Sequence, residues 1–170
     1  MDLREKIRNV PNFPQQGIQF KDITTLLKDG KAFRTAIDLL ATPYKEQNID
    51  IVVGPEARGF AVGAPVAYVL DAGFVPIRKP GKLPAATISY QYSLEYGKDA
   101  LEIHKDAIEP GSRVLIVDDL LATGGTTMAT VKMVEQLGGK VVGLAFLIEL
   151  TCLNGRQGLA GYDITALIQY

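Results

Sequence analysis

Residues 114–127 read VLIVDDLLATGGTT. The apolar run from Val114 to Val117 predicts a buried strand, and helical spacing from about Thr126 to Leu137 predicts a helix after the glycines. Gly124 and Gly125 would let a ligand approach the backbone closely, and the first N–H groups of a helix have no partner within it. The segment therefore predicts a parallel α/β sheet that binds an anion where this strand ends.

The pair Asp118 and Asp119 follows that strand, although carboxylates repel a phosphate placed beside them. The pair makes sense if the carboxylates accept hydrogen bonds from sugar hydroxyls or hold water on a divalent cation next to the phosphate. The loop after them would add backbone and hydroxyl donors from Ala122, Thr123, Gly124, Gly125, Thr126 and Thr127. A phosphorylated ribose satisfies both demands, whereas the plainer alternative is a helix-capping loop end without a ligand.

The remaining pattern predicts one α/β domain over residues 1–170, with a largely parallel central sheet flanked by helices. The expected strands are 49–53, 74–77, 114–117, 141–148 and an edge strand near 162–168. The expected helices lie near 2–10, 32–40 after an Asp29 cap, 60–70 and 126–137. Residues 80–97 indicate a polar, tyrosine-bearing loop between two βαβ units.

Composition and charge narrow the class of protein. The chain has 170 residues, 47% of them hydrophobic, and 18 basic against 19 acidic residues, which gives a formal net charge of −1. This charge offers no electrostatic basis for binding nucleic acid or an acidic membrane, so we expect a small-molecule ligand. The longest apolar run, 60–70, is too short to cross a bilayer, and Cys152 is the only cysteine, without a secretory signal before it. We therefore expect a cytoplasmic protein.

Basic side chains at two other predicted strand ends are candidate anion ligands. Arg58 could grip a diphosphate with its guanidinium fork, and the alternative is a surface ion pair with Glu56. Arg78, Lys79 and Lys82 suit a leaving anion but would also suit a solvated turn. The chain lacks both the G-x-x-x-x-G-K-[ST] and the strand-linked G-x-G-x-x-G pattern, and His104 and Cys152 fit no metal or nucleophile pattern. P-loop and dinucleotide chemistry are therefore not expected.

The 114–127 segment resembles the phosphoribosyl pyrophosphate signature of the type I phosphoribosyltransferases. Four more segments resemble members of that family that use adenine: FPQQGIQFKDI (13–23), GPEARGF (54–60), IRKPGKLP (77–84) and YSLEYG (92–97). The resemblance implies the fold of that family and transfer of phosphoribosyl to adenine, which releases AMP and pyrophosphate in purine salvage. It also implies Mg²⁺, held mainly by substrate and water near Asp118 and Asp119, and a homodimer.

The resemblance assigns roles residue by residue. The signature loop would hold the 5′-phosphate and ribose, while Arg58, Arg78, Lys79 and Lys82 would bind pyrophosphate, with Arg78 reaching the neighbouring subunit's site. Residues 1–30 would form a base-binding segment, in which Phe20 stacks on adenine and the backbone of Gln19 and Lys21 reads its edge, while Leu150 closes the pocket. The family often has arginine where Lys21 stands, and it carries a cis peptide that here would be Glu56–Ala57.

The remaining implied role belongs to a flexible loop over residues 80–100, which would close over the site and carry Glu95 as the catalytic acid and base. Residue patterns alone leave alternatives open: Phe20 could plug the core, and Glu95 could be an inert exposed residue. Two rival functions are a DNA-binding regulator with the same fold and a transferase for 6-oxopurines. The first lacks a basic DNA-reading module, and the second would differ around Gln19 to Lys21.

Overall fold

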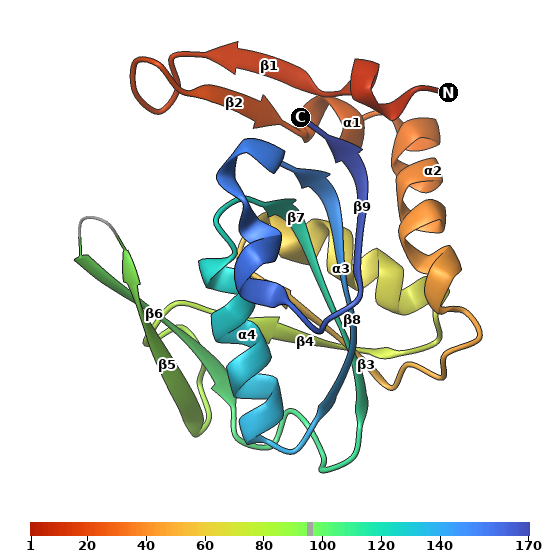
Figure 1. The fold of residues 1–170 in the computed structure, drawn as a ribbon. Helices are drawn as coiled ribbons and strands as arrows, with labels where there is room; N and C mark the ends of the chain where they lie inside the picture. The colour runs from red at the N-terminus through yellow and green to blue at the C-terminus, as the bar shows by residue number, and fades with distance from the viewer. Residues whose placement is uncertain (95–96) are drawn as a thin grey trace.

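A computed structural model describes residues 1–94 and 97–170. Its centre is a five-stranded, wholly parallel sheet in the order β4-β3-β7-β8-β9. Helices α2 and α3 cover one face of this sheet and α4 covers the other (Figure 1). The strands are β3 (Ile51–Pro55), β4 (Gly73–Ile77), β7 (Arg113–Leu121), β8 (Lys140–Glu149) and β9 (Ile164–Gln169). The principal helices are α2 (Gly30–Ala41), α3 (Arg58–Val69) and α4 (Gly125–Gln136). The predicted parallel α/β fold is confirmed.

Alternate residues of β7 supply the two hydrophobic cores on either side of the sheet. Leu115 and Val117 are buried in the core under α2 and α3, and Val114 and Ile116 are buried in the core under α4. Successive side chains of a strand point to opposite faces, so an uninterrupted apolar run is required where both faces are covered. This burial on both faces fixes β7 as the centre of the sheet.

Local signals account for where the helices begin. The Asp29 carboxylate accepts hydrogen bonds from the amides of Lys31 and Ala32, as expected of an N-cap, and α2 follows it. Gly124, with φ of 88°, turns the chain into α4 in a left-handed conformation that side chains disfavour. Among the described residues, no helix is both long and apolar enough to cross a membrane.

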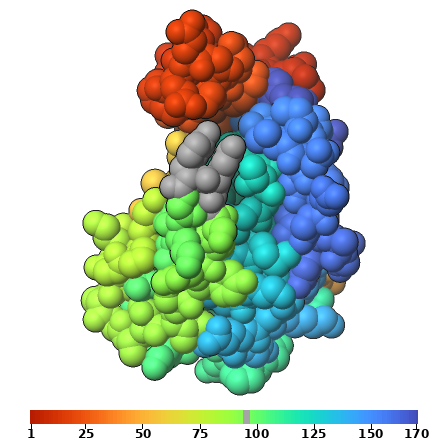
Figure 2. Space-filling view, turned by 60° about the vertical axis from the view of Figure 1, so that its left-hand side comes forward, coloured from red at the N-terminus to blue at the C-terminus, as the bar shows by residue number. Residues whose placement is uncertain are grey.

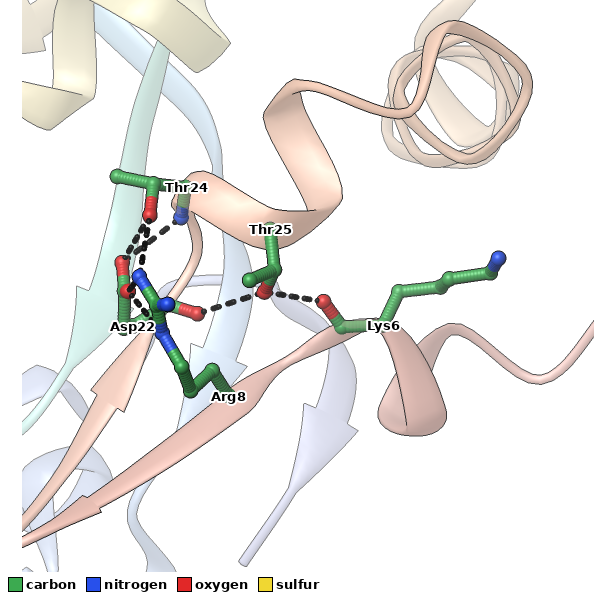
Figure 3. A network of polar contacts seen from close by, with 5 residues as sticks. All are labelled: Lys6, Arg8, Asp22, Thr24 and Thr25. Carbon is green, nitrogen blue, oxygen red and sulfur yellow. Dashed lines mark hydrogen bonds and ion pairs between the residues drawn. The ribbon is translucent and has the colours of Figure 1, made fainter.

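The expected helix over residues 2–10 is wrong. Only one 3-10 turn forms, η1 (Leu3–Lys6), and the chain continues as β1 (Arg8–Pro11), which pairs antiparallel with β2 (Gln19–Asp22). Cross-strand contacts override the local spacing: Arg8 Nε donates to Asp22 Oδ2 at 2.9 Å. Figure 3 shows this ion pair joined to Thr24 and Thr25 at the start of α1 (Thr24–Leu27).

The segment read as a polar loop also forms structure. Strands β5 (Thr87–Leu94) and β6 (Gly97–His104) pair antiparallel and project beside α4 (Figure 1). Leu101 and Ile103 of β6 are buried in the α4 core, which anchors the base of this hairpin. The remaining elements are 3-10 turns: η2 (Thr42–Tyr44), η3 (Thr151–Leu153) and η4 (Gly155–Leu159).

Candidate functional site

The largest concentration of predicted site residues lies where β3 and β7 end. A cleft of about 420 Å³ opens there between the loop after β3 and the loop after β7. Its lining consists of Glu56, Ala57, Arg58, Lys79, Asp118, Asp119, Leu120, Ala122, Thr123, Gly124, Gly125, Thr126 and Thr127. Figure 2 shows the N-terminal segment (red) at the top of the molecule and the β5–β6 hairpin (green) below it. Such a position, at the carboxyl ends of parallel strands, is where α/β sheets bind ligands.

The glycine turn before α4 forms the floor of this cleft. The 12-residue helix α4 begins at Gly125, and the amides of its first turn have no acceptor within the helix. Gly124 packs closely against the start of η4, because a Cβ at Gly124 would lie 2.7 Å from the carbonyl oxygen of Gly155. The turn therefore presents backbone donors at the positive end of a helix, which suits a phosphate dianion.

The two acids lie on the strand itself, because β7 continues past the expected end at Val117 to Leu121 by pairing with β8. The Asp119 amide donates to Asp118 Oδ1 at 2.8 Å, and Arg58 Nε donates to Asp119 Oδ2 at 2.6 Å. Burial, together with the negative charge of Asp119, raises the pKa of Asp118 well above its usual range. A cation or a sugar hydroxyl beside Asp118 would relieve this unfavourable charge.

The basic residues divide between the cleft and its rim. Arg58 pairs with Asp119 rather than with Glu56, so the surface-pair alternative for Arg58 is wrong. Glu56 instead accepts the amide of Lys79 at 2.8 Å and Arg78 Nε at 3.2 Å, and these hydrogen bonds lower its pKa. The Glu56–Ala57 peptide is cis, as the resemblance implied. Among the described residues, Lys79 lines the cleft, whereas Arg78 does not, and Lys82 is exposed beyond it.

The predicted base-binding residues are not in the lining of the cleft. Phe20, on β2, lies beside the lining residue Arg58, whose guanidinium carbon is 5.3 Å from the centre of the phenylalanine ring. The Lys21 side chain points elsewhere, with Nζ 3.1 Å from Asn9 Oδ1 and 4.0 Å from the centre of the Tyr170 ring. Gln19 pairs with Pro11 in the same hairpin. The plug-the-core alternative for Phe20 is not supported, because the ring is only half-buried.

Leu150 and Glu95 complete the predicted set. Leu150 follows β8, and its amide donates to the carbonyl of Leu121 at 3.0 Å, so it lies at the same end of the sheet as residues 122–126. Glu95 falls outside the described residues.

Three residues of the site escaped the sequence reasoning. Gly59 allows the close approach of Asp118, because a Cβ there would lie 2.9 Å from Asp118 Oδ1. Gly155 packs against the backbone of Ala122 and Gly124, and the Tyr92 hydroxyl lies 3.4 Å from Thr126 Oγ1. Gly59 and Tyr92 belong to the segments 54–60 and 92–97, but the sequence assigns neither of them a role there. All three contacts join residues far apart in sequence, so no local pattern could have indicated them.

Comparison with known proteins places this geometry in context. A family model described as the phosphoribosyl transferase domain matches residues 22–158. The adenine phosphoribosyltransferase of Alkaliphilus oremlandii is 64% identical over 170 residues, which cover 100% of this chain and 99% of the relative. The structure of adenine phosphoribosyltransferase from Rhodothermus marinus is 56% identical with a TM-score of 0.95, covering 99% of this chain and 96% of that one. A structure of adenine phosphoribosyltransferase from Giardia lamblia, complexed with 9-deazaadenine, is 35% identical with a TM-score of 0.93. It covers 99% of this chain and 96% of that one.

Proposed function

The chain belongs to the adenine phosphoribosyltransferase family, and from this premise we propose that it transfers the phosphoribosyl group of phosphoribosyl pyrophosphate to adenine. The products are AMP and pyrophosphate, and the reaction serves purine salvage in the cytoplasm. The observation that carries the proposal is the cleft in which Asp118, Asp119 and the glycine turn before α4 face Arg58 across the ends of β7 and β3. This arrangement brings together a site for the 5′-phosphate, a site for the sugar, and the Arg58 side chain, which can bind the diphosphate.

The 5′-phosphate binds at the turn formed by residues 122–126. The N–H groups at the start of α4 and the hydroxyls of Thr123 and Thr126 donate hydrogen bonds to its oxygens. Asp118 and Asp119 accept hydrogen bonds from the ribose hydroxyls. Because these hydroxyls carry no negative charge, the two carboxylates do not repel them. The loop thereby orients the anomeric carbon toward the open side of the cleft.

A magnesium ion accompanies the diphosphate, and the donor set at Asp118 and Asp119 fits it. Hard carboxylate oxygens suit Mg²⁺, and Asp119 already gives one oxygen to Arg58, which leaves this pair suited to holding water on the ion. Within residues 1–94 and 97–170, no group of three or more acidic, histidine or cysteine side chains could hold an ion by itself. We therefore assign most of the ligands to substrate and water. When bound, the ion neutralises charge on the departing pyrophosphate.

Substitution occurs at the anomeric carbon, and positive charge develops on the sugar as pyrophosphate leaves. Arg58 and Lys79, which line the cleft, stabilise the leaving group together with Lys82 at the rim. Arg58 can exchange its bond to Asp119 for the diphosphate, because its side chain is 47% exposed. Closure of residues 80–100 over the site excludes water and so limits hydrolysis of the activated sugar.

Adenine stacks on Phe20, and Leu150 forms the opposite apolar wall. The Gln19 carbonyl accepts from the 6-amino group, and the Lys21 amide donates to N1. That the Lys21 side chain is engaged with Asn9 and Tyr170 supports a role for its backbone alone. Glu95 manages the imidazole proton of the base, a general acid–base task worth roughly 10²- to 10⁴-fold in rate.

We also propose a homodimer, in which Arg78 contributes to the neighbouring subunit's site. In the single chain Arg78 pairs with Glu56, and its side chain is 34% exposed, so it is accessible to a partner at the edge of the cleft. Mixing the Arg78→Ala and Asp118→Asn variants tests this: activity above the mean of the two separate variants supports a shared site, and activity equal to that mean contradicts it.

The experiment that tests the function is pyrophosphate release across a panel of free bases, with phosphoribosyl pyrophosphate and Mg²⁺ at saturation. Hypoxanthine and guanine present a 6-oxo group to the Gln19 carbonyl and an N1–H to the Lys21 amide, so both contacts become repulsive. We expect adenine to be preferred by roughly 10⁴ to 10⁵ in kcat/KM. Comparable turnover of hypoxanthine would exclude adenine specificity, and no release with any base would exclude phosphoribosyl transfer.

A further inference from the structure

Glu149 is a buried carboxylate that does not line the cleft. It ends β8, and only 4% of the residue is exposed. Arg156 grips it with two hydrogen bonds, Nε to Oε1 at 2.7 Å and a terminal guanidinium nitrogen to Oε2 at 2.8 Å. Gln169 Nε2 donates a third at 2.9 Å. The carboxylate is thus fully engaged by β9 and by the turn η4.

The turn that carries Arg156 packs against the phosphate loop, which is the proposed 5′-phosphate site at residues 122–126. Gly155, the residue before Arg156, has no room for a side chain, because a Cβ there would clash with the carbonyl oxygen of Ala122. A Cβ at Gly124 would likewise lie 2.7 Å from the carbonyl oxygen of Gly155. These close approaches of Gly155 to Ala122 and Gly124 are between backbones, which cannot adapt by changing a rotamer, so the position of Gly155 sets the position of the loop.

Glu149 itself is tied to the same end of the sheet. It is the register partner of Leu121, and the next amide, of Leu150, donates to the Leu121 carbonyl. The Glu149–Arg156 pair therefore connects the end of β8 to the turn that lies under residues 122–124.

Energetics favour a geometric role for this pair. Removing the Glu149 carboxylate from water costs several kcal/mol, and apolar residues often serve stability as well at such a position. The Arg156 side chain stays 44% exposed, so the pair is buried on the Glu149 side only. What an apolar pair cannot supply is the fixed orientation of a two-pronged guanidinium–carboxylate contact. A role in placing Gly155 explains why a charged pair stands here.

We propose that Glu149 and Arg156 are positioning residues for phosphoribosyl pyrophosphate, acting through Gly155 on the loop that binds its 5′-phosphate. The inference rests on the proposed function. Neither side chain touches the substrate. Their loss lets the loop shift, so that the backbone donors and the phosphate no longer align.

The test compares Arg156→Leu with wild type by steady-state kinetics. The KM for phosphoribosyl pyrophosphate should rise about tenfold or more, since a misplacement of about 1 Å costs roughly 10²-fold. The KM for adenine should change less, because Phe20 stands on the separate β1–β2 hairpin and Leu150 keeps its backbone hydrogen bond to Leu121. A variant that merely unfolds in part loses active enzyme, which lowers the apparent kcat and leaves KM unchanged. An unchanged KM for phosphoribosyl pyrophosphate would overturn the proposal.

Three variants make the result specific. Arg156→Lys keeps the charge but loses the fork, so its KM should fall between those of wild type and Arg156→Leu. Glu149→Leu/Arg156→Leu removes the unpaired buried charge and should fold, yet its KM should stay high, and a wild-type value would overturn the proposal.

Arg113→Leu is the matched control: Arg113 Nε donates to the Gln47 carbonyl at 2.8 Å at the opposite end of β7. Its KM should equal that of wild type, and a similar rise there would also overturn the proposal. Failure of the proposed function is separate, because wild type itself would then release no pyrophosphate.

Discussion

Replacing Gly59 by alanine should slow the enzyme while leaving its fold intact. The added Cβ would lie 2.9 Å from Asp118 Oδ1 and 2.9 Å from Pro55 Cδ, where ordinary contact begins at 3.4 Å. The Asp118 carboxylate must therefore move by about half an ångström, and because a 1 Å misplacement costs roughly 10²-fold, we expect kcat/KM to fall roughly tenfold. Overpacking costs about 1–3 kcal/mol, and alanine is about 1 kcal/mol more favourable than glycine in a helix, so the free energy of unfolding should fall by about 2 kcal/mol at most.

The assay is steady-state pyrophosphate release at varied phosphoribosyl pyrophosphate, with thermal melting in parallel. Gly63→Ala is the matched control, because Gly63 is buried one turn further along α3 and its Cβ would lie 3.0 Å from the Phe74 ring. Its helix propensity and packing terms resemble those of Gly59→Ala, but no contact with Asp118 changes. We expect near wild-type kcat/KM for Gly63→Ala. Equal kinetics for both variants, or an unchanged kcat/KM for Gly59→Ala, would refute the role of this close approach.

Three further perturbations address other parts of the molecule. Asp118→Asn should weaken phosphoribosyl pyrophosphate turnover at least tenfold without lowering the melting temperature, and wild-type kinetics over a full titration would contradict the sugar-site assignment. Glu95→Gln should lower kcat by roughly 10² with a smaller change in KM, and a pre-steady-state burst measurement would show whether chemistry still limits the rate. Hydrogen bonds from the Thr24 hydroxyl and amide, and then Arg8, lower the pKa of Asp22 to about 2 from 3.8, so its stabilisation is present above pH 4 and is lost as the pH falls through 2. Asp22→Asn should therefore lose about 1 kcal/mol at pH 7, and its urea midpoint should fall less than that of wild type between pH 4 and 2.

The central sheet could be predicted from the sequence because its strands are buried on both faces. Such strands need unbroken apolar runs, and the run at Val114 to Val117 carries that requirement in its own residues. The two antiparallel hairpins could not be predicted in this way. Leu3, Ile7 and Val10 have helix-like spacing, but pairing of β1 with β2 overrides it at residues 8–11. The sequence predicts a loop where β5 forms, because the hydrogen bonds of β5 come from its partner β6. Pairing between separate segments leaves no periodic signal in either one alone.

Chemistry that resides in single residues was likewise visible in the sequence. The types and order of the acids, glycines and threonines in 118–126 predict an anion and sugar site from the sequence alone. Only the tertiary structure decided what holds that site in shape: the pairing of Arg58 with Asp119, the space that Gly59 leaves for Asp118, and the support of the loop by Gly155. The physical reason is that these are packing contacts between segments far apart along the chain. Their distances are set by how the strand ends and turns meet at one edge of the sheet, and no local stretch of sequence encodes that meeting.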